Sequence, residues 1–244
     1  MTSTHQAHVI LMRTASQTPI ANRLLAALPH AEYQRLLANL EPVTLAFAEV
    51  LYQPGDPIRH IYFPNNALLS LLTLVDRDHA LEVGMVGCEG VIGIDLALGI
   101  GTSPFRALVQ GAGTALRMKT EIFRKKIQHS LHLQREVHRY IHALIAQIAQ
   151  TAACNRFHVV EARLARWLLM TRDRIGSDHF YLTHEFIGHM LGVRRVGVTN
   201  AAHALKQNGL IDYSRGNIVI IDELGLEAAA CSCYEVDKAY YVKA

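Results

Sequence analysis

Residues 183–205 read Thr183-His-Glu-Phe-Ile-Gly-His-Met-Leu-Gly-Val-Arg-Arg-Val-Gly-Val-Thr-Asn-Ala-Ala-His-Ala-Leu205, and the fold is decided here. Apolar residues recur at helical spacing on both sides of Gly192-Val193. Polar side chains lie on the opposite face of the second group. We predict two short helices joined by a turn, a helix-turn-helix whose second helix fits the major groove of DNA. The apolar positions are Ile187, Met190, Leu191, Val198, Ala201, Ala202 and Leu205.

The polar face of the second predicted helix carries side chains that can contact bases. Arg195 suits a bidentate pair with guanine, and Asn200 suits one with adenine. Thr199 can touch a base edge or a thymine methyl group, and Val196 adds an apolar contact. Arg194 stands at the helix start, where a phosphate contact is expected.

Further DNA contacts are predicted on both sides of this helix. Thr183 is the expected N-cap of the first helix, with a phosphate contact as a second role. Residues 210–214 and 218–222 are typical of a hairpin, and a hairpin directly after a helix-turn-helix is a wing. Its tip either contacts DNA or is a solvated turn. The predicted DNA-binding set is Thr183, Arg194, Arg195, Val196, Thr199, Asn200, His203, Arg215 and Asn217.

Composition indicates a folded protein with room for two domains. The chain has 244 residues, of which 50% are hydrophobic and 18% charged. A net charge of +3 permits nucleic-acid binding without arguing for it. We find no secretory signal and no apolar run of about 18 residues, so we expect a cytoplasmic protein with reduced thiols and no membrane contact.

The first half of the chain predicts a β domain. Residues 20–40 are typical of two short helices broken at Pro29. Residues 43–52 are predicted to form one strand, and further short apolar or alternating runs continue to Met118 with turns between them. Short strands without intervening helices predict an antiparallel sandwich or barrel. The polar residues 1–18 are expected to form an arm outside it.

A long helical run follows the strands, because no Pro or Gly occurs between Thr120 and Ile175. One stripe along it has the 4, 3, 4, 3 spacing of a coiled-coil seam. Two partners are possible for this stripe, a second copy of the chain or the barrel of the same chain. We favour self-pairing, because a barrel already has a closed core. A further helix is expected over 159–174, and an Ala-rich helical tail over 224–231. The stripe is Val137, Ile141, Leu144, Ile148 and Thr151.

This element order and four local motifs resemble the Crp/Fnr family of dimeric bacterial transcription regulators. The motifs are Leu51–Phe63, Gly87–Gly93 in the place of the family's phosphate-binding cassette, Phe186–Asn200, and Asn208–Ile211. Within the family, residues 82–90 and 230–234 are similar to a subgroup without an assigned effector.

The resemblance implies an α+β fold in three parts. These are an N-terminal antiparallel jelly roll or barrel of the cyclic-nucleotide-binding type (20–125), a dimerisation helix (126–157) and a winged helix-turn-helix (158–244). It further implies a homodimer on an inverted-repeat operator, with double-stranded DNA and RNA polymerase at promoters as partners.

The cassette departs from the pattern of family members that bind cyclic nucleotides. Those members carry Gly-Glu in the cassette and an Arg-Ser or Arg-Thr pair further on. Here Ile94 follows Gly93, with Asp95 one residue late, and Phe105-Arg106 replaces the second pair. A buried anion without a partner costs several kcal/mol. We therefore predict that cyclic AMP is not the effector; the alternative is a cyclic nucleotide held through Arg106.

The cysteines give no metal-binding pattern, since no CxxC pair occurs. Cys231-Ser-Cys233 is either a redox or metal pair or an unremarkable pair near the terminus, and Cys88 and Cys154 are expected as small core residues. The N-terminal cysteine group of iron–sulfur members of the family is absent. We predict no cofactor.

Other residues give no sign of an enzyme. His138 and His142 have a spacing that can bind metal, but no third ligand is identifiable, so an exposed helix flank is preferred and no metal site is predicted. Neither a nucleophile–base constellation nor a phosphate-binding loop of the Walker type occurs. Besides a DNA-binding regulator, the sequence leaves open a small-molecule or redox sensor whose winged domain binds a protein.

Overall fold

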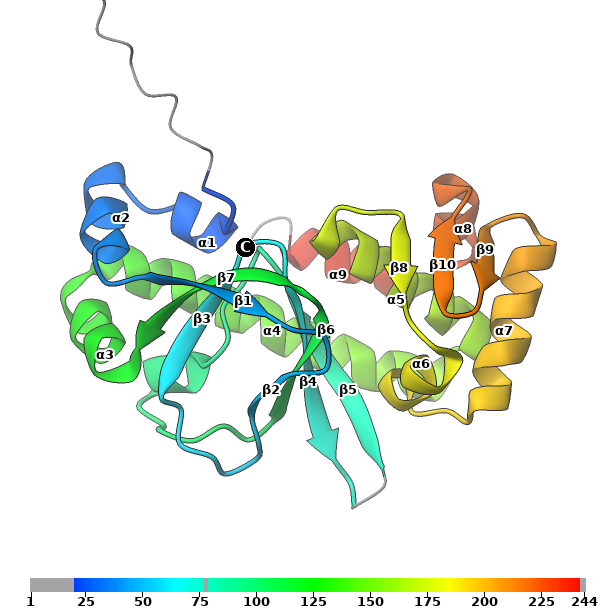
Figure 1. Ribbon diagram of the computed structural model, residues 1–244, viewed down its shortest axis with the longest axis horizontal. Helices are drawn as coiled ribbons and strands as arrows, with labels where there is room; N and C mark the ends of the chain where they lie inside the picture. Colours follow the sequence, from blue (N-terminus) through cyan, green and yellow to red (C-terminus); the bar gives the residue numbers. More distant parts are fainter. Residues whose placement is uncertain (1–19, 77–78, 242–244) are drawn as a thin grey trace, which may run out of the picture.

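The computed structural model describes residues 20–76 and 79–241, which form two lobes (Figure 1). The first lobe contains the first seven strands, and the second contains the helix-turn-helix. The predicted arm, residues 1–18, lies outside the described residues. None of the helices in the described ranges is long and apolar enough to cross a membrane.

The N-terminal lobe is an antiparallel two-sheet sandwich, as predicted. One sheet has the strand order β1-β7-β3 and the other β2-β6-β4-β5. Ile61, Phe63, Val109 and Met118 are almost fully buried between them. The elements of this lobe are α1 (Arg23–Ala26), α2 (His30–Leu37), β1 (Glu41–Leu45), β2 (Val50–Tyr52), β3 (His60–Pro64), β4 (Leu68–Leu74), β5 (Ala80–Val86), the 3₁₀ helix η1 (Ile94–Leu98), β6 (Arg106–Gly111) and β7 (Gly113–Lys119).

The prediction of one strand over residues 43–52 is wrong. The chain forms β1 and β2, which belong to different sheets. A turn between them places Ala48 at φ 64°, and the Glu49 carboxylate accepts a hydrogen bond from the Ala46 amide at 2.9 Å. Apolar residues continue through the turn, so the sequence pattern does not mark the change of sheet.

Three helices follow: α3 (Thr120–His129), α4 (Leu131–Phe157) and α5 (Val160–Ile175). The long helix begins at Leu131 and not at residue 126, because Ser130 interrupts the run. The Ser130 hydroxyl accepts a hydrogen bond from the Leu133 amide at 3.0 Å, so it caps α4. It also donates to the Glu32 carboxylate of α2. The start of α4 is therefore fixed to the N-terminal helices.

The interpretation of the α4 stripe as a seam between two copies is wrong. Val137, Ile141 and Leu144 are buried in the same apolar core as the barrel strands, and Ile148 packs against that core. The two sheets do not close this core by themselves, since α4 completes it. Gly84 of β5 makes room for the helix, because an added Cβ atom would lie 3.1 Å from the Leu144 side chain.

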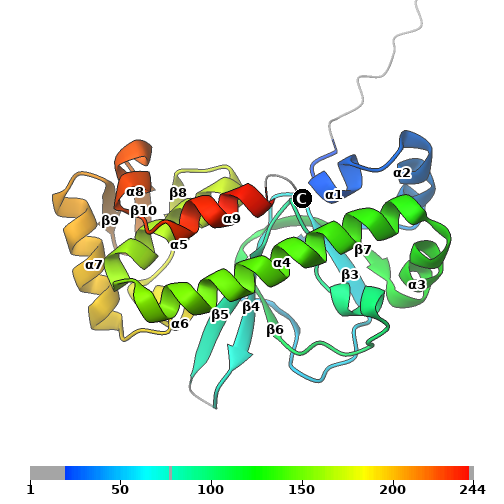
Figure 2. The same ribbon diagram turned by 180° about the vertical axis from the view of Figure 1, so that it is seen from behind.

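The C-terminal lobe has the predicted helix-turn-helix and wing, with one strand and one helix beyond the prediction. The wing is a three-stranded sheet of order β8-β10-β9. The unpredicted helix, α9, packs against α4 on the back of the molecule (Figure 2). The elements are β8 (His179–Tyr181), α6 (His184–Leu191), α7 (Arg195–Gln207), β9 (Ile211–Ser214), β10 (Asn217–Ile220), α8 (Glu223–Ala229) and α9 (Cys233–Tyr241).

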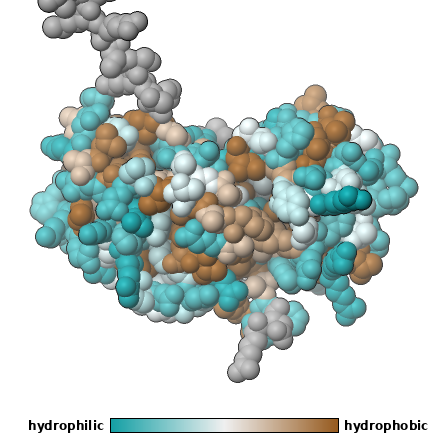
Figure 3. Space-filling model, in the orientation of Figure 1, coloured by the Kyte–Doolittle hydropathy of each residue, from teal (hydrophilic) through white to brown (hydrophobic). Residues whose placement is uncertain are grey.

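The two lobes are packed against each other and share a core. Leu68, Leu72 and Met85 of the barrel strands lie in one apolar cluster with the buried residues of α5, α6 and α7. Phe47 of the β1–β2 turn meets Phe186 of α6, with ring centroids 5.5 Å apart. Figure 3 shows hydrophobic residues gathered in the middle of this face, between the lobes.

Two buried carboxylates of the N-terminal lobe also reach α5. Glu82 of β5 accepts a hydrogen bond from the Trp167 indole N–H at 2.8 Å, and Glu89 pairs with the Arg174 guanidinium at 2.8 Å. Burial raises the pKa of Glu82 to about 7. The guanidinium of Arg174 also lies 4.4 Å from the centre of the Tyr241 ring in α9. The barrel, α5 and α9 are thus joined by polar as well as apolar contacts.

Candidate nucleic-acid interface

The first helix of the motif, α6, begins and ends where the sequence predicts. The Thr183 hydroxyl accepts a hydrogen bond from the Phe186 amide at 3.2 Å, which confirms Thr183 as the N-cap. Gly192 ends the helix at φ 63°, a left-handed conformation that favours glycine. Gly188 allows the close turn between the two helices, because a Cβ atom there would lie 2.9 Å from the Val193 carbonyl oxygen.

The second helix, α7, buries one face and exposes the other. Val198, Ala201, Ala202 and Leu205 are buried, as predicted, and pack in the cluster that includes α5. The small side chains of Ala201 and Ala202 let α7 approach α5 closely. The opposite face of α7 is held toward solvent by this packing.

The exposed face of α7, the predicted DNA-reading face, consists of Arg194, Arg195, Val196, Thr199, Asn200 and His203. All are exposed except Thr199, which is half-buried. Val196 is 62% exposed, although it is a large apolar side chain. Within the part of the chain that the structure describes, neither Arg194 nor Arg195 forms an ion pair. Two positive charges and an amide are therefore available to an external partner.

Thr199 has a structural role that the sequence did not indicate. Its hydroxyl donates to the Arg195 carbonyl at 3.1 Å and lies 3.1 Å from the Nδ1 atom of His184. The His184 ring packs against Tyr213 of the wing, with centroids 4.8 Å apart. Burial and the nearby Arg195 charge lower the pKa of His184. Thr199 and His184 thus tie α6, α7 and the wing together.

The tip of the wing projects polar side chains. Arg215 and Gly216 both have positive φ angles, 49° and 88°, as a tight hairpin turn of the I′ type requires. Arg215 and Asn217 are exposed. Both lie at the tip of the β9–β10 hairpin, as predicted.

The predicted effector residues have partners within the barrel. Gly93 precedes η1 at φ 93°, and Ile94 and Phe105 are half-buried against the apolar core. Burial raises the pKa of Asp95. The Arg106 guanidinium donates to the Gln53 side-chain oxygen at 2.9 Å.

The cassette stretch also contains Glu89, whose role the sequence did not indicate. Glu89 lies between Cys88 and Gly90, and its carboxylate pairs with Arg174 of α5. Both side chains are at least 98% buried. This acidic residue therefore joins the cassette to the C-terminal lobe. The partner is 85 positions away in the chain, so no local pattern predicts the pair.

A second group of residues meets at the end of α4. Cys154, His158, Cys231 and Cys233 place their donor atoms within 4.8 Å of one another. From the sequence, Cys154 is expected as a core residue, and Cys231 and Cys233 as a separate pair. The thiol–thiol hydrogen bond between Cys154 and Cys231 lowers the pKa of Cys154 and raises that of Cys231. Cys88 lies outside the group, and His138 and His142 are exposed on α4.

Comparison with known proteins identifies the C-terminal lobe. Residues 162–229 match the model of the Crp-like helix-turn-helix domain. None of the curated proteins matches the chain by sequence.

Solved structures with similar folds match about four fifths of this chain. A Crp/Fnr-family transcriptional regulator from Eubacterium rectale aligns with a TM-score of 0.64 and 17% identity over 83% of this chain and 94% of that one. FixK2 from Bradyrhizobium japonicum aligns with a TM-score of 0.68 and 14% identity over 79% and 98%. The c-di-GMP-responsive global regulator CLP from Xanthomonas campestris aligns with a TM-score of 0.65 and 16% identity over 79% and 99%.

The chain is therefore of the Crp/Fnr type in its architecture. Its residues 162–229 form a Crp-like helix-turn-helix domain, and its overall fold is that of Crp/Fnr transcription regulators. The resemblance found in the sequence is confirmed at this level. The proteins it resembles are regulators and not enzymes.

Proposed function

We propose that this protein is a sequence-specific DNA-binding transcription regulator that acts as a homodimer on an inverted-repeat operator. The observation that carries the proposal is the exposed polar face of α7 on a Crp-like helix-turn-helix domain. A helix with this face fits the major groove of DNA. A dimer of the protein would place two such helices about 34 Å apart on one side of the DNA. We further propose that RNA polymerase is a partner at promoters.

Individual contacts follow from the side chains on this face. Arg195 pairs with guanine and Asn200 with adenine, while Val196 contacts a thymine methyl group. Arg194, at the N-cap of α7, contacts a phosphate. Thr199 contributes its methyl group, because its hydroxyl already bonds within the protein.

Outer parts of the domain add further contacts in the proposed complex. His203 lies one turn beyond Thr199 on the DNA-reading face. Thr183, at the start of α6, and the wing residues Arg215 and Asn217 contact phosphates at the edges of the site. These contacts set the position of α7 and add affinity, but carry little sequence information.

The proposed dimer forms through the face of α4 opposite the barrel. A second stripe with 4, 3, 4, 3 spacing lies there, and its members are exposed. Leu131 is 79% exposed and Ile145 is 61% exposed. The barrel covers the other face of α4, so a partner helix would pack on this one, with apolar contacts at Leu131 and Ile145. Figure 2 shows α4 running along the outside of both lobes. The exposed stripe is Leu131, Arg135, His138, His142, Ile145, Ala149 and Ala152.

We propose that cyclic AMP is not the effector. Ile94 stands where nucleotide-binding members have a carboxylate, and the Arg106 guanidinium is bonded to Gln53. Calorimetric titration with cyclic AMP and cyclic GMP tests this statement directly. We expect no saturable heat, and micromolar binding of either nucleotide would show that Arg106 still serves a phosphate.

Selection from random duplex DNA with the full chain tests the function itself. We expect an enriched inverted repeat, and Arg195→Ala should bind the selected site about 1–3 kcal/mol more weakly and lose preference at one base pair in each half-site. Arg35→Ala, which removes an exposed arginine on α2, is the matched control and should bind like the wild type. Failure to enrich any repeat would favour a winged domain that contacts a protein.

A further inference from the structure

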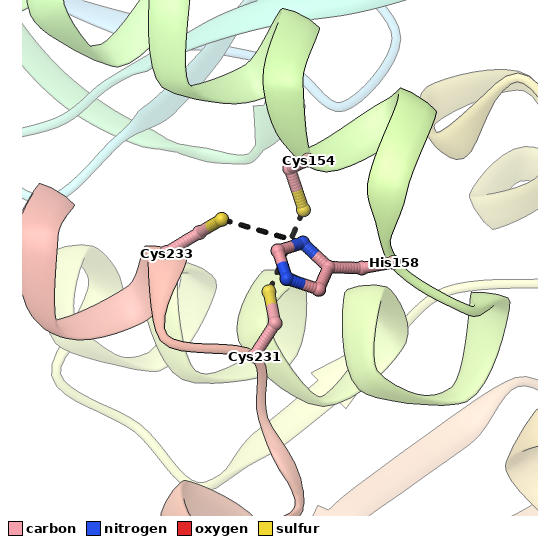
Figure 4. A group of neighbouring side chains, drawn as sticks. All are labelled: Cys154, His158, Cys231 and Cys233. Carbon is pink, nitrogen blue, oxygen red and sulfur yellow. Dashed lines mark hydrogen bonds between the residues drawn. The ribbon is translucent and has the colours of Figure 1, made fainter.

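Three thiols and an imidazole converge at the junction between α4 and α5. Cys154 lies in the last turn of α4, and His158 is the C-cap residue of that helix. Cys231 and Cys233 come from the segment between α8 and α9. Figure 4 shows all four side chains pointing toward a common centre, from two segments that are 73 residues apart in sequence.

The distances between donor atoms fit one tetrahedral metal ion. The sulfur atoms of Cys154 and Cys231 are 3.5 Å apart, and the Cys233 sulfur lies 3.5 Å from the Nδ1 atom of His158. A zinc ion with Zn–S bonds of about 2.3 Å and Zn–N bonds of about 2.0–2.1 Å has donor–donor edges of about 3.5–3.8 Å. All four donors lie within 4.8 Å of one another. The site is therefore near the size that a single zinc ion requires.

Other occupants fit these residues less well. A disulfide needs sulfur atoms about 2.05 Å apart, so the thiols must move to form one, and it leaves the third cysteine and the imidazole unused. A cluster of several irons places its own bridging sulfides between the protein ligands, which needs more space than these donors leave. Three thiolates with one imidazole in a tetrahedral arrangement are the ligand set of structural zinc sites.

The charges around the cysteines favour a negatively charged complex. Zinc with three thiolates and a neutral imidazole carries one net negative charge. Arg163 is buried beside the site, and its guanidinium donates to the neutral oxygens of Asn155 and Leu191. Within residues 20–76 and 79–241, no carboxylate pairs with it. A buried cation without a counter-charge is costly, and the zinc–thiolate complex would supply that charge.

Outer-shell hydrogen bonding is also in place. The Gln150 amide donates to the Cys233 sulfur at 2.9 Å. Donors of this kind orient and stabilise a metal-bound thiolate. Gln150 lies one turn before Cys154 on α4, so the helix supplies two ligands and one supporting group.

We propose that Cys154, His158, Cys231 and Cys233 bind one zinc ion. The ion fixes the segment between α8 and α9 to the end of α4. This is the point where the long helix meets α5 and the C-terminal lobe. The site is structural in kind, since all four positions of the tetrahedron are taken by protein ligands.

The first test uses the full-length protein without any variant. Reduced protein is stripped with a chelator and titrated with Zn²⁺ against a chromophoric zinc chelator. We expect one zinc per chain, and a rise in the melting temperature on zinc addition, because zinc binds the folded chain more tightly than the unfolded one. Replacing zinc by Co²⁺ should give the intense visible bands of a tetrahedral site and a thiolate-to-cobalt charge-transfer band.

Variants then assign the ligands. Cys231→Ser should weaken zinc binding by more than about 100-fold, whereas Gln150→Leu should weaken it by about 10–100-fold. Cys88→Ser removes a cysteine outside the site and should bind zinc like the wild type. If Cys231→Ser does not fold, His158→Asn serves in its place, because His158 is only half-buried at a helix end.

Several results would overturn the proposal, and none involves DNA. They are a reduced wild-type protein that takes up far less than one zinc, an octahedral cobalt spectrum, and an equal loss of zinc in Cys88→Ser. A Cys154–Cys231 disulfide in air-oxidised protein, together with no zinc uptake after reduction, would make the cysteines a redox pair instead. The DNA-binding function is tested separately, by the selection from random duplex DNA.

Discussion

Helices α7 and α4 each bury one stripe and expose another, but the exposed stripes differ in chemistry. The exposed face of α7 offers guanidinium and amide groups, with Arg195 and Asn200 directed to solvent. The exposed face of α4 offers Leu131 at one end, Ile145, Ala149 and Ala152 toward the other, and the polar Arg135, His138 and His142 between them. Directional donors suit base edges, whereas apolar and small residues at coiled-coil spacing suit a second helix. The two faces therefore call for different partners.

The largest expected effect is at the exposed α4 stripe. Ile145→Glu places a carboxylate from each chain in the proposed seam, so the dimer should dissociate. Since a dimer binds both half-sites at once, DNA affinity should fall by about 100- to 10,000-fold. Sedimentation velocity measures the first effect, and binding to the selected inverted repeat measures the second.

An introduced glutamate outside α4 is the control. Ala31 is exposed on α2, outside the stripe, so Ala31→Glu should remain dimeric. If Ile145→Glu also remains dimeric and binds DNA normally, the dimer is formed by another surface.

A substitution in the buried α4 stripe should affect the stability of the fold and not the dimer. Leu144→Ala removes a side chain that is 5% exposed in the barrel core, so the free energy of unfolding should fall by about 2–5 kcal/mol. The oligomeric state should not change. Chemical denaturation at fixed protein concentration measures the first quantity, and a shift to monomer in this variant would mean that the stripe also serves a partner chain.

How much of the structure the sequence predicts depends on how far apart in the chain the segments that pack together lie. Periodicity correctly identified which residues of α7 and of α4 are buried, because it follows from helix geometry alone. It did not identify what buries them. For α7 the partners are the neighbouring helices α5 and α6, while for Val137 and Leu144 the partner is a barrel whose first strand lies about 100 residues earlier. A stripe that packs against the chain's own barrel has the same residue spacing as a stripe that packs against a second copy of the chain.

The candidate sites follow the same rule. The exposed residues of the helix-turn-helix are contiguous in sequence, so all of Arg194, Arg195 and Asn200 could be predicted. The pair Glu89–Arg174 and the group around Cys154 each join segments more than 70 residues apart. Cys154 and His158 are one helical turn apart, and Cys231 and Cys233 are two positions apart. These spacings predict a metal site only when the two pairs are considered together. Their convergence depends on α9, a helix that the sequence did not predict.

The contact between Glu82 of β5 and Trp167 of α5 should give stability a pH dependence. Burial raises the pKa of Glu82 to about 7, from 4.5 for a free side chain. Between these two values the folded state binds the proton more tightly, so Glu82 stabilises the fold at low pH and this stabilisation is lost as pH rises through about 7. The loss is up to about 3 kcal/mol on the basis of this shift.

Glu82→Gln should remove that dependence. A glutamine keeps an oxygen that can accept the Trp167 hydrogen bond but has no charge to bury. The difference in unfolding free energy between pH 5 and pH 8 should therefore become smaller than in the wild type. Urea denaturation at the two pH values checks this, and an equal difference in both proteins would show that Glu82 does not titrate in this range.

The smallest expected effect distinguishes stability from DNA contact on α7 itself. Gly197 lies near the start of α7, and a Cβ atom there would meet only the Val193 side chain, at 3.9 Å. The protein therefore gives no steric reason for a glycine, which costs about 1 kcal/mol relative to alanine inside a helix. Gly197→Ala should raise the free energy of unfolding by about 1 kcal/mol. It should also weaken DNA binding, because in the proposed complex the DNA backbone passes close to this position, beside the DNA-reading face. Gly188→Ala is the matched control: its Cβ would lie 2.9 Å from the Val193 carbonyl oxygen, so it should lower stability instead. A Gly197→Ala protein that is more stable and binds its operator with unchanged affinity would mean that DNA does not approach α7 at this position, and the proposed docking of the helix would have to be rotated away from it.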